Sequence, residues 1–412
     1  MSAATANPDA LIRALEAAVA SPDQVRTRAL DRYANANDAS HYLLVPRAVV
    51  VAGDAGEVGR LLQVSAAHGV PLTFRSGGTS LSGQAVGSGL LVDTRRRFRG
   101  VEVLDDGARV RVQPGITVRQ LNAHLARYGR KFGPDPASES ACTVGGVVAN
   151  NSSGMACGTV DNAYQTLESI VLVLPSGTVV DTGGTDADSR LRAAEPKLHE
   201  GLSRLRDRVR ANPASVRTIE RQFAMKNTMG YSLNAFLDHD DAAGILAHLA
   251  VGSEGTLGFV AEAVFRTVPV LPHAATGLLV FAELGAATEV LPDLVGTGAA
   301  TVELLDAASL RVGQADPKAD EILRAIEVDR HAALLVEYQA PSAAELAEIR
   351  AAGAAVLDGL PLSVPAALTS DAGSRARLWH VRKGLYAAVA GARPSGTTAL
   401  LEDIVVPVSA LA

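Results

Sequence analysis

The sequence predicts an α+β protein of two domains, and two observations lead to this prediction. Residues 47–74 read as a strand, a helix and a strand, in the apolar run RAVVVAGD, the amphipathic run AGEVGRLLQVSAAHG and the apolar run VPLTF. Near residue 271 the composition changes, because the prolines of RTVPVLP interrupt the chain and Ala-rich stretches alternate with strand-like runs after them. We therefore expect an N-terminal helical segment at 1–40, a ligand-binding domain at 41–271 and a second domain at 272–412.

The elements of the first domain follow from apolar spacing and turn residues. Leu11, Leu15 and Val19 recur at helical spacing and predict a helix over residues 8–20. Gly69 closes the next helix, since glycine adopts the left-handed conformation that ends a helix. The elements expected after it are strands in GLLVDT and ARVRVQPG, a helix in TVRQLNAHLARYG, a hairpin at 169–183 and peripheral helices in the charge-rich stretch 184–222.

Apolar runs also organise the second domain. Three of them predict strands: GLLVFAEL, ATVELLD and AALLVEYQA. Ala-rich stretches such as SAAELAEIRAAGAAVLDGL (342–360) separate these strands and predict helices. The second domain is therefore expected to be α+β as well.

The composition excludes several classes of protein. The 412 residues carry a net charge of −6 and only 4% aromatic side chains, whereas nucleic-acid binders usually need a basic face and often stacking rings. The two cysteines, Cys142 and Cys157, are too few for a disulfide framework or a cysteine-ligated iron–sulfur cluster. The start, MSAATANPDALIRALEAAVA, lacks the features of a secretory signal, and no apolar run reaches the roughly 18 residues of a membrane span. We expect a cytoplasmic protein that binds no nucleic acid.

The segment RSGGTSLSGQ (75–84) follows a predicted buried strand and is built almost entirely of small residues. Its backbone N–H groups are unencumbered and can form a concave nest for phosphate oxygens. A solvent-facing glycine loop is the simpler interpretation of this segment alone. A serine nucleophile is disfavoured because no G-x-S-x-G elbow occurs. The dipeptide Gly-Lys and the G-x-G-x-x-G fingerprint are also absent, so any nucleotide is held by a different design.

Two further glycine-rich stretches change this interpretation. PGITVRQL (114–121) precedes FGPDPASESACTVGGVVANNSSGMACGTV (132–160), which we expect to be too rich in glycine for an ordinary helix or strand. VGSEGTLGFVAEAVFRTVP (251–269) joins a third glycine turn to a strand. Each stretch alone predicts only a turn. Together, each beside a predicted strand, they indicate one long ligand cradled by backbone.

In their order and spacing, RSGGTSLSGQ, PGIT, CTVGGVVANNSSG and GSEGTLG resemble the FAD-binding domain of the vanillyl-alcohol oxidase and p-cresol methylhydroxylase type. KNTMGYSLNAFLD (226–238) and LWHVRKGL…GTTALLEDIVVP (378–407) resemble the branch of D-lactate, glycolate and D-2-hydroxyglutarate dehydrogenases, above all the flavoprotein half of bacterial fusions with an iron–sulfur region. The resemblance spans nearly the whole chain. It implies a two-subdomain FAD-binding domain of this type at 41–271, and an α+β cap domain with an antiparallel sheet at 272–412 that is incomplete at its C-terminus.

The resemblance also implies which residues contact FAD. Those expected at the pyrophosphate are Gly77, Gly78, Thr79, Ser80, Gly83 and Gln84. Those expected at the flavin and ribityl are Pro114, Gly115, Ser138, Thr143, Gly145, Gly146, Asn150, Ser152 and Gly154, with Glu254, Gly255 and Thr256 in a matching third segment. Glycines let the backbone approach the diphosphate, whose charge the N–H groups stabilise without a lysine.

The resemblance implies FAD that is not covalently attached. Some relatives bond FAD to a histidine two positions after the first glycine of the first loop, and this chain has Thr79 there. Cys142 lies near the position where other relatives use a thiol, but one residue out of register. We therefore expect flavin that is free to dissociate.

The implied reaction is oxidation of a D-2-hydroxy acid, such as D-lactate, glycolate or D-2-hydroxyglutarate, to the 2-oxo acid. Arg382 matches an arginine that binds the substrate carboxylate, and its simpler interpretation is a solvated helix arginine, as expected for Arg375 and Arg377. Thr397 stands where that branch carries a substrate lysine, which puts a second carboxylate contact in doubt. Three residues are weaker candidates for the pocket: Tyr231, Glu402 and Asp403.

The branch places its metal-binding and base histidines after the EDIVVP-like stretch, but this chain ends five residues after Pro407. None of its nine histidines forms an H-x-H or H-E-x-x-H pair, so the sequence predicts no metal site. Two interpretations stay open. One is a flavin dehydrogenase, or a fragment of one, that passes electrons to an iron–sulfur region or subunit, a quinone or a cytochrome. The other is a non-catalytic FAD-binding electron-transfer subunit of a glycolate-oxidase-like complex. Either could lie peripherally on a membrane through its electron acceptor.

Overall fold

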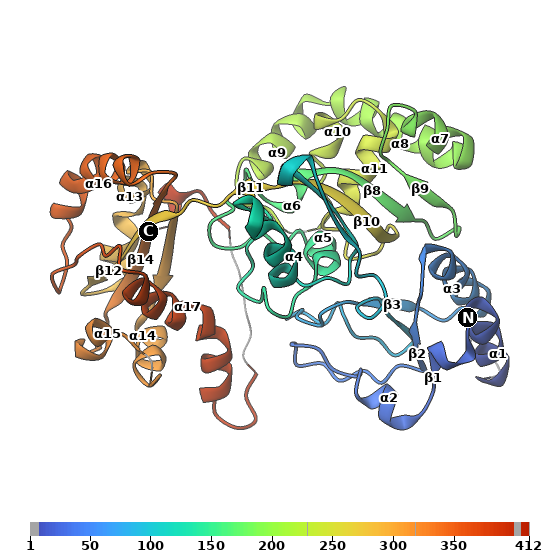
Figure 1. Cartoon of the computed structure of the whole chain (residues 1–412), viewed down its shortest axis with the longest axis horizontal. Helices are drawn as coiled ribbons and strands as arrows, with labels where there is room; N and C mark the ends of the chain where they lie inside the picture. The colour runs from blue at the N-terminus through green and yellow to red at the C-terminus, as the bar shows by residue number, and fades with distance from the viewer. Residues whose placement is uncertain (1–7, 229, 318, 399–404, 412) are drawn as a thin grey trace. The chain divides into compact units, whose positions relative to one another are not determined.

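The structure is a computed structural model that describes residues 8–228, 230–317, 319–398 and 405–411 (Figure 1). The chain divides into two compact units, Met1–Pro269 and Val270–Ala412. Each unit combines helices with sheets, which confirms the predicted α+β class. Within the described ranges, no helix is both long enough and apolar enough to cross a bilayer.

The first sheet of unit 1 contains the predicted strand–helix–strand segment. Its strands, in spatial order, are β1 (Val25–Arg26), β2 (Ala48–Val51), β4 (Leu90–Asp93) and β3 (Leu72–Arg75). β2, β4 and β3 run parallel, so their carboxyl ends share one edge of the sheet. Helix α3 (Ala55–His68) connects β2 to β3 and ends at Gly69, whose φ is 61°. The helices packed near this sheet are α1 (Pro8–Ala18) and α2 (Ala29–Tyr33).

The second sheet of unit 1 is antiparallel throughout. Its strands, in spatial order, are β5 (Val101–Leu104), β6 (Arg109–Val112), β10 (Phe259–Arg266), β8 (Leu167–Val173) and β9 (Val179–Asp181). β8 and β9 form the hairpin that the sequence predicted at 169–183. A separate two-stranded pair joins β7 (Arg130–Lys131) to β11 (Val268–Pro269).

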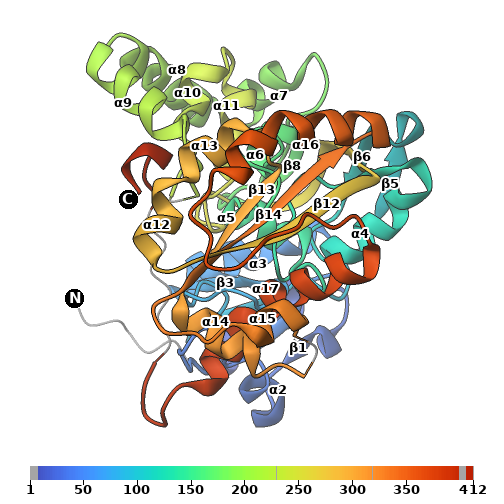
Figure 2. The ribbon, with the colours of Figure 1, turned by 90° about the vertical axis from the view of Figure 1, so that its left-hand side faces the viewer.

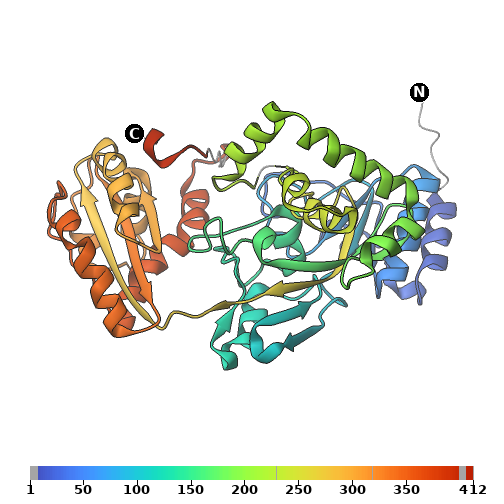
Figure 3. The same ribbon diagram turned by 90° about the horizontal axis from the view of Figure 1, so that it is seen from above.

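Helices cover one face of this second sheet. They are α4 (Val118–Leu125), α5 (Val144–Asn150), α6 (Ala163–Thr166), α7 (Ala187–Ala194), α8 (Pro196–Arg210), α9 (Pro213–Phe223), α10 (Ala235–Asp238) and α11 (Ala242–Ala250). Apolar residues of the sheet and helices, such as Val112, Leu121, Val148 and Phe265, share one core. Figures 1 and 3 show α7 to α9, in green, on the same side of the sheet. The glycine-rich segments therefore rest on a rigid scaffold.

The glycine-rich stretch 132–160 contains a helix, so our expectation that it would avoid regular structure was wrong. α5 includes both Gly145 and Gly146. Val144, Val147 and Val148 bury this helix in the core, and tertiary packing outweighs the low helix propensity of glycine. The helix ends at Asn151, which takes the left-handed conformation at φ 52°.

Unit 2 is a three-stranded antiparallel sheet covered on both faces. Its strands, in spatial order, are β12 (His273–Phe281), β14 (Ala332–Ala340) and β13 (Thr301–Leu305). Its helices are α12 (Leu284–Glu289), α13 (Leu291–Gly296), α14 (Ala307–Gln314), α15 (Glu321–Ala325), α16 (Ala343–Asp358) and α17 (Ala372–Ala392). Leu279 and Phe281 face the core beside α12, α13 and α16, whereas Leu278 and Val280 face the core beside α14, α15 and α17. Figure 2 shows α13 and α16 on one side of the sheet and α14, α15 and α17 on the other. The antiparallel sheet agrees with the expected cap domain. Among the residues that the structure describes, short 3-10 turns lie at Pro22–Gln24, Asp105–Gly107, Ala126–Tyr128 and Val408–Ala410.

Candidate functional site

Three glycine loops lie at the ends of regular elements in unit 1. The first loop (76–84) follows β3, the second (138–154) surrounds α5, and the third (252–258) joins α11 to β10. The predicted cofactor residues Gly77, Gly78, Thr79, Ser80, Gly83 and Gln84 lie on the first loop. Ser138, Thr143, Gly145, Gly146, Asn150, Ser152 and Gly154 lie on the second, Glu254, Gly255 and Thr256 on the third, and Pro114 and Gly115 directly after β6.

The first and second loops touch through backbone at Gly77. A Cβ atom at this position would lie 2.4 Å from the carbonyl oxygen of Ala141 and 3.0 Å from the Cα of Cys142. Separations of this size are far below van der Waals contact, so the approach requires glycine. The second loop is itself tied down, because the N–H groups of Ala141 and Cys142 donate to the carbonyl of Ser138 at 2.8 and 2.9 Å.

The segment after β6 packs against the start of α5. The N–H of Gly145 donates to the carbonyl of Pro114 at 3.0 Å, and the N–H of Val144 donates to that of Ile116 at 2.9 Å. A Cβ atom on Gly145 would lie 2.4 Å from the Cβ of Pro114. Gly115 is equally enclosed, since its N–H donates to the carbonyl of Phe98 at 2.7 Å. Pro114 and Gly115 are therefore brought beside the second loop.

The side chain of Glu254 joins all three loops. Asn150 of the second loop donates its amide to Glu254 Oε1 at 2.7 Å, and Gln84 of the first loop lies 3.5 Å from the same oxygen. The N–H of Glu254 also donates to the carbonyl of Ala149 at 2.8 Å. Burial raises the pKa of the Glu254 carboxyl, and the hydrogen bond from Asn150 offsets part of this shift. Residues that are far apart in the sequence thus meet at one carboxylate.

Arg75, the last residue of β3, lies beneath the first loop. Its guanidinium donates to the carbonyls of Asn37 at 2.9 Å and Ala85 at 3.3 Å. It packs so closely on Gly78 that a Cβ there would lie 2.5 Å from Arg75 Nη2. Burial lowers the pKa of Arg75, although an arginine still remains charged. Arg75 is not among the residues predicted from the sequence; the available signal was a cation at the end of a strand whose loop carries no charge of its own.

Gly146 on α5 borders unfilled space, and a buried hydroxyl without a partner in the described ranges lies near it. A Cβ added to Gly146 would meet nothing closer than Ser76 Cβ and Thr143 Oγ1, both at 3.9 Å. The Thr143 hydroxyl is buried and has no hydrogen-bond partner within the described part of the chain. Tyr231, a weaker candidate, lies beside the third loop with its hydroxyl 2.8 Å from Thr256 Oγ1. The surface near Gly146 is therefore polar and unfilled.

The two cysteines are poor nucleophiles. Both are buried and free. Burial raises the pKa of the Cys142 thiol, and burial with the nearby Asp135 carboxylate raises that of Cys157 to about 12. A protonated thiol reacts slowly, so neither side chain is activated as a nucleophile.

The predicted substrate arginine lies in unit 2, on α17. Arg382 donates through Nε to Glu303 Oε2 of β13 at 2.6 Å. His380, two residues earlier on the helix, pairs with Asp316 at 3.0 Å. Thr397 donates its hydroxyl to the carbonyl of Pro394 at 2.7 Å. Glu402 and Asp403 lie outside the described residues.

Arg375 is not the solvated arginine that we expected. Its Nη2 donates to the buried Glu337 of β14 at 3.0 Å and its Nε to Thr276 Oγ1 at 3.1 Å. Glu337 also accepts from Trp379 Nε1 at 2.6 Å and from Gln339 at 2.6 Å. Burial alone would raise the pKa of Glu337, but these hydrogen bonds outweigh it and lower the pKa. Arg377 is half-exposed, as expected, and pairs with Asp320 at 3.3 Å.

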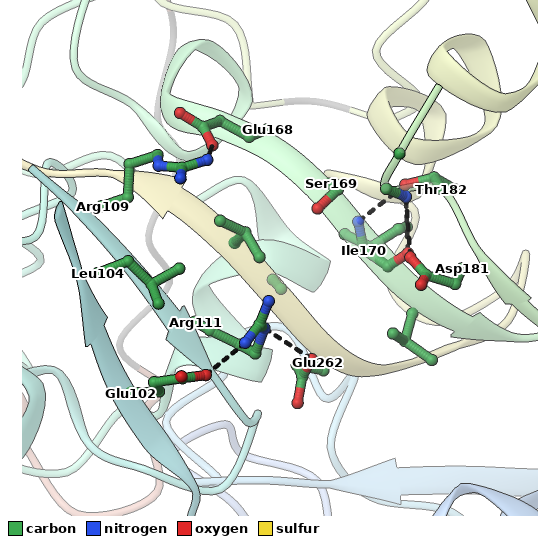
Figure 4. A pocket seen from close by; sticks show the side chains of 15 residues that line it. Glu102, Leu104, Arg109, Arg111, Glu168, Ser169, Ile170, Asp181, Thr182 and Glu262 are labelled. Carbon is green, nitrogen blue, oxygen red and sulfur yellow. Dashed lines mark hydrogen bonds and ion pairs between the residues drawn. The ribbon is translucent and has the colours of Figure 1, made fainter. Parts of the chain in front are cut away.

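A groove of about 840 Å³ crosses one face of the second sheet and is lined by residues of β5, β6, β8, β9 and β10 (Figure 4). Arg111 lies between Glu102 and Glu262, and Arg109 pairs with Glu168 at 3.2 Å. Cross-strand pairs of this kind are typical of the solvent-facing side of an antiparallel sheet. The groove contains none of the predicted site residues, and we do not assign it to the reaction.

Comparison with known families gives two matches along the chain. Residues 46–183 match the family described as "FAD binding domain". Residues 271–412 match the family described as "FAD linked oxidases, C-terminal domain". The first match includes the first and second glycine loops, and the second includes Arg382.

Curated relatives carry the names of hydroxy-acid oxidoreductases. D-2-hydroxyglutarate dehydrogenase of Haemophilus influenzae is 25% identical, over 71% of this chain and 29% of the relative. Glycolate oxidase subunit GlcD of Bacillus subtilis is 25% identical, over 90% of this chain and 67% of the relative. D-lactate dehydrogenase of Archaeoglobus fulgidus is 30% identical, over 55% of this chain and 41% of the relative. The chain thus spans less than a third of the first of these proteins.

Solved structures support the fold. An alkyldihydroxyacetonephosphate synthase superposes with a TM-score of 0.65 at 18% identity, covering 95% of this chain and 67% of that one. At this identity the likeness concerns the arrangement of elements alone.

Proposed function

We propose that this chain, which belongs to the FAD-linked oxidases, binds FAD without a covalent bond and dehydrogenates a D-2-hydroxy acid to the 2-oxo acid. D-lactate, glycolate and D-2-hydroxyglutarate are the substrates we consider, since the relatives carry these names. The electrons would pass to an acceptor other than oxygen, such as an iron–sulfur region or subunit, a quinone or a cytochrome. The observation that carries the proposal is the convergence of the three glycine loops on Glu254.

The residues of the three loops fit FAD. The first loop presents backbone at Gly77 and Gly78 with the Arg75 guanidinium beneath it, so a diphosphate would meet N–H donors and a half-buried positive charge. The unfilled space at Gly146 leaves room for the cofactor, and the Thr143 hydroxyl, which has no partner among the described residues, is a hydrogen-bonding group near it. The Glu254 carboxylate would repel phosphate, so its part is to hold Asn150 and Gln84 in place. Bound FAD would supply the two-electron oxidant.

The part of Arg382 would be to hold the substrate. A 2-hydroxy acid carries a carboxylate next to the carbon that is oxidised, and a guanidinium binds a carboxylate through two parallel N–H donors. Fixing that end of a small molecule orients the hydrogen on the neighbouring carbon. Within the described ranges, Arg382 uses only its Nε in a protein contact, which leaves both Nη groups for this purpose.

We expect the purified protein to be yellow and to release all its flavin on acid precipitation. Thr79 offers no nucleophile comparable to histidine, and the Cys142 thiol is buried and protonated. The measurement is flavin absorbance in the supernatant and the pellet after trichloroacetic acid treatment. Flavin that stays in the pellet after washing would contradict the non-covalent assignment.

We also expect anaerobic addition of a D-2-hydroxy acid to bleach the flavin. D-lactate, glycolate and D-2-hydroxyglutarate are mixed separately with the holoprotein, with L-lactate as the control for stereochemistry, and absorbance near the visible maximum is followed. Dithionite is added last, and the absorbance change that it produces corresponds to complete reduction of the flavin. Bleaching by one D-acid and not by L-lactate supports the dehydrogenase. A flavin that dithionite reduces but none of the three acids bleaches contradicts it and favours the electron-transfer subunit.

A further inference from the structure

We infer that Glu303 is a positioning residue for substrate binding, which holds Arg382 by its Nε edge so that both Nη groups stay open for the substrate carboxylate. The inference rests on the proposed function, because it concerns the arginine assigned to the hydroxy acid. Nothing in the resemblance or the family matches assigns a part to Glu303.

The position of Glu303 in the sheet of unit 2 directs its side chain toward α17. Glu303 lies on β13 opposite Leu335 of β14, and directly paired residues in an antiparallel sheet point to the same face. Leu335 packs in the core that contains Leu378 of α17. Glu303 therefore points toward this helix, and its Oε2 accepts from Arg382 Nε at 2.6 Å. The side chains of Arg382 and Glu303 are 29% and 17% exposed, so the pair is partly shielded from water but reachable.

The donors of Arg382 are used unevenly. A guanidinium has five N–H donors in a planar fork, one on Nε and two on each Nη. Among the described residues, only the Nε of Arg382 has a partner. A pair made through Nε fixes the plane of the guanidinium and turns its far edge, which carries both Nη groups, away from the acid. A carboxylate can then approach that edge without displacing Glu303.

Arg375, on the same helix, is an arginine whose donors are used in contacts with buried groups of the protein. It lies seven residues before Arg382, two helical turns away, so both side chains leave the same face of α17. Arg375 engages Thr276 and Glu337 through Nε and Nη2, and its carboxylate partner is 5% exposed and already accepts from three other side chains. The Arg375–Glu337 pair is therefore enclosed by other side chains. In the Arg382–Glu303 pair, by contrast, the Nη groups of Arg382 have no partner among the described residues.

The negative charge of Glu303 has a separate effect, because it lies near an anionic substrate. Glu303→Gln keeps an amide oxygen that can accept from Arg382 Nε and removes the like charge. Glu303→Ala removes both, and a freed arginine side chain must then be ordered by the substrate itself. The two variants therefore separate positioning from charge.

The experiment is an anaerobic titration of the FAD-loaded proteins with D-lactate and with D-2-hydroxyglutarate, following flavin absorbance, with steady-state KM and kcat in parallel. We expect Glu303→Ala to weaken binding about tenfold and to raise KM with little change in kcat. Glu303→Gln should bind within about twofold of the unchanged protein or more tightly. Arg382→Met should bind about 10- to 150-fold more weakly. Adding Glu303→Ala to Arg382→Met should change binding by less than about twofold, because Glu303 acts through Arg382.

Three results overturn the inference while leaving the proposed function intact. Tighter binding by Glu303→Ala shows that the acid competes with substrate for Arg382. Binding by Glu303→Gln as weak as by Glu303→Ala shows that charge, and not the Nε contact, matters. A further loss in the double variant shows that Glu303 acts independently of Arg382. If the unchanged protein binds neither D-lactate nor D-2-hydroxyglutarate, the result contradicts both the proposed function and the inference. If the unchanged protein binds one of the two acids and Arg382→Met binds that acid equally well, Arg382 does not hold the substrate. The inference about Glu303 is then wrong as well.

Discussion

Replacing Gly77 with alanine is expected to weaken FAD binding by about 5- to 150-fold, because overpacking of this kind typically costs 1–3 kcal/mol. The added methyl group would lie 2.4 Å from the carbonyl oxygen of Ala141 and 3.0 Å from the Cα of Cys142. Both obstacles are backbone atoms, and the hydrogen bonds to the Ser138 carbonyl keep them in place. The first and second loops must therefore separate, which moves the Gly78 backbone and its neighbours away from the diphosphate.

Gly146→Ala is the matched comparison. Outside its own helix backbone, a methyl group here would have Ser76 Cβ and Thr143 Oγ1 as its nearest neighbours, both at 3.9 Å, and alanine is the better helix former by up to about 1 kcal/mol. The apoprotein should thus be as stable as before or more so, yet FAD should bind more weakly if the cofactor occupies that space. Binding is measured by titrating apoprotein with FAD and following flavin fluorescence, and stability by thermal unfolding without FAD. Unchanged FAD affinity in Gly77→Ala would contradict the loop contact, and unchanged affinity in Gly146→Ala would place the cofactor elsewhere.

Much of the fold could be predicted because its elements are locally encoded. The apolar run of β2, the amphipathic α3 and the closing Gly69 each carry their own signal within a few residues. The turn residues Pro-Ser-Gly between two apolar runs predict the hairpin of β8 and β9. The glycine loops were found in the same way, and the prediction that they serve one ligand needed only their order along the chain.

The remainder depends on partners that local sequence does not reveal. α5 was missed because two glycines lower helix propensity, while three valines that face a core restore it. The short strand β5 was missed because its burial pattern is only partial and it exists through pairing with β6. The convergence on Glu254 joins residues up to 170 positions apart, so only the folded chain brings them together.

Arg375 and Arg382 show the same limit for single side chains. Both lie on one helix, and apart from the family resemblance, which selects Arg382, the local sequence predicts a solvated side chain for each of them. Their difference lies in the acids opposite them on the sheet, the enclosed Glu337 and the accessible Glu303. A buried acid needs its cation for stability, whereas an accessible pair can serve binding. Replacing Arg375 should therefore lower the stability of unit 2, whereas replacing Arg382 should weaken substrate binding.

Arg375→Met is accordingly expected to destabilise unit 2 by roughly 2–3 kcal/mol, because it leaves the Glu337 carboxylate buried with its charge unpaired. Thr276, Gln339 and Trp379 still donate to that carboxylate, which keeps the loss below that of a wholly uncompensated charge. Arg377→Met is the control on the same helix: its side chain is 52% exposed and its pair with Asp320 spans 3.3 Å, so a loss below about 1 kcal/mol is expected.

The chain supplies its own probe for this measurement. Trp379 is the single tryptophan of the sequence and donates to Glu337 at 2.6 Å, so its fluorescence reports on unit 2 and on the site of the substitution. With the usual urea dependence of 1–3 kcal/mol per molar, Arg375→Met should lower the urea midpoint of the tryptophan signal by about 0.7–3 M, and Arg377→Met should lower it much less. FAD release, followed separately, should keep its midpoint in both variants, since the glycine loops belong to unit 1. Equal tryptophan midpoints for the two variants would show that the buried pair is not what holds α17 on its sheet.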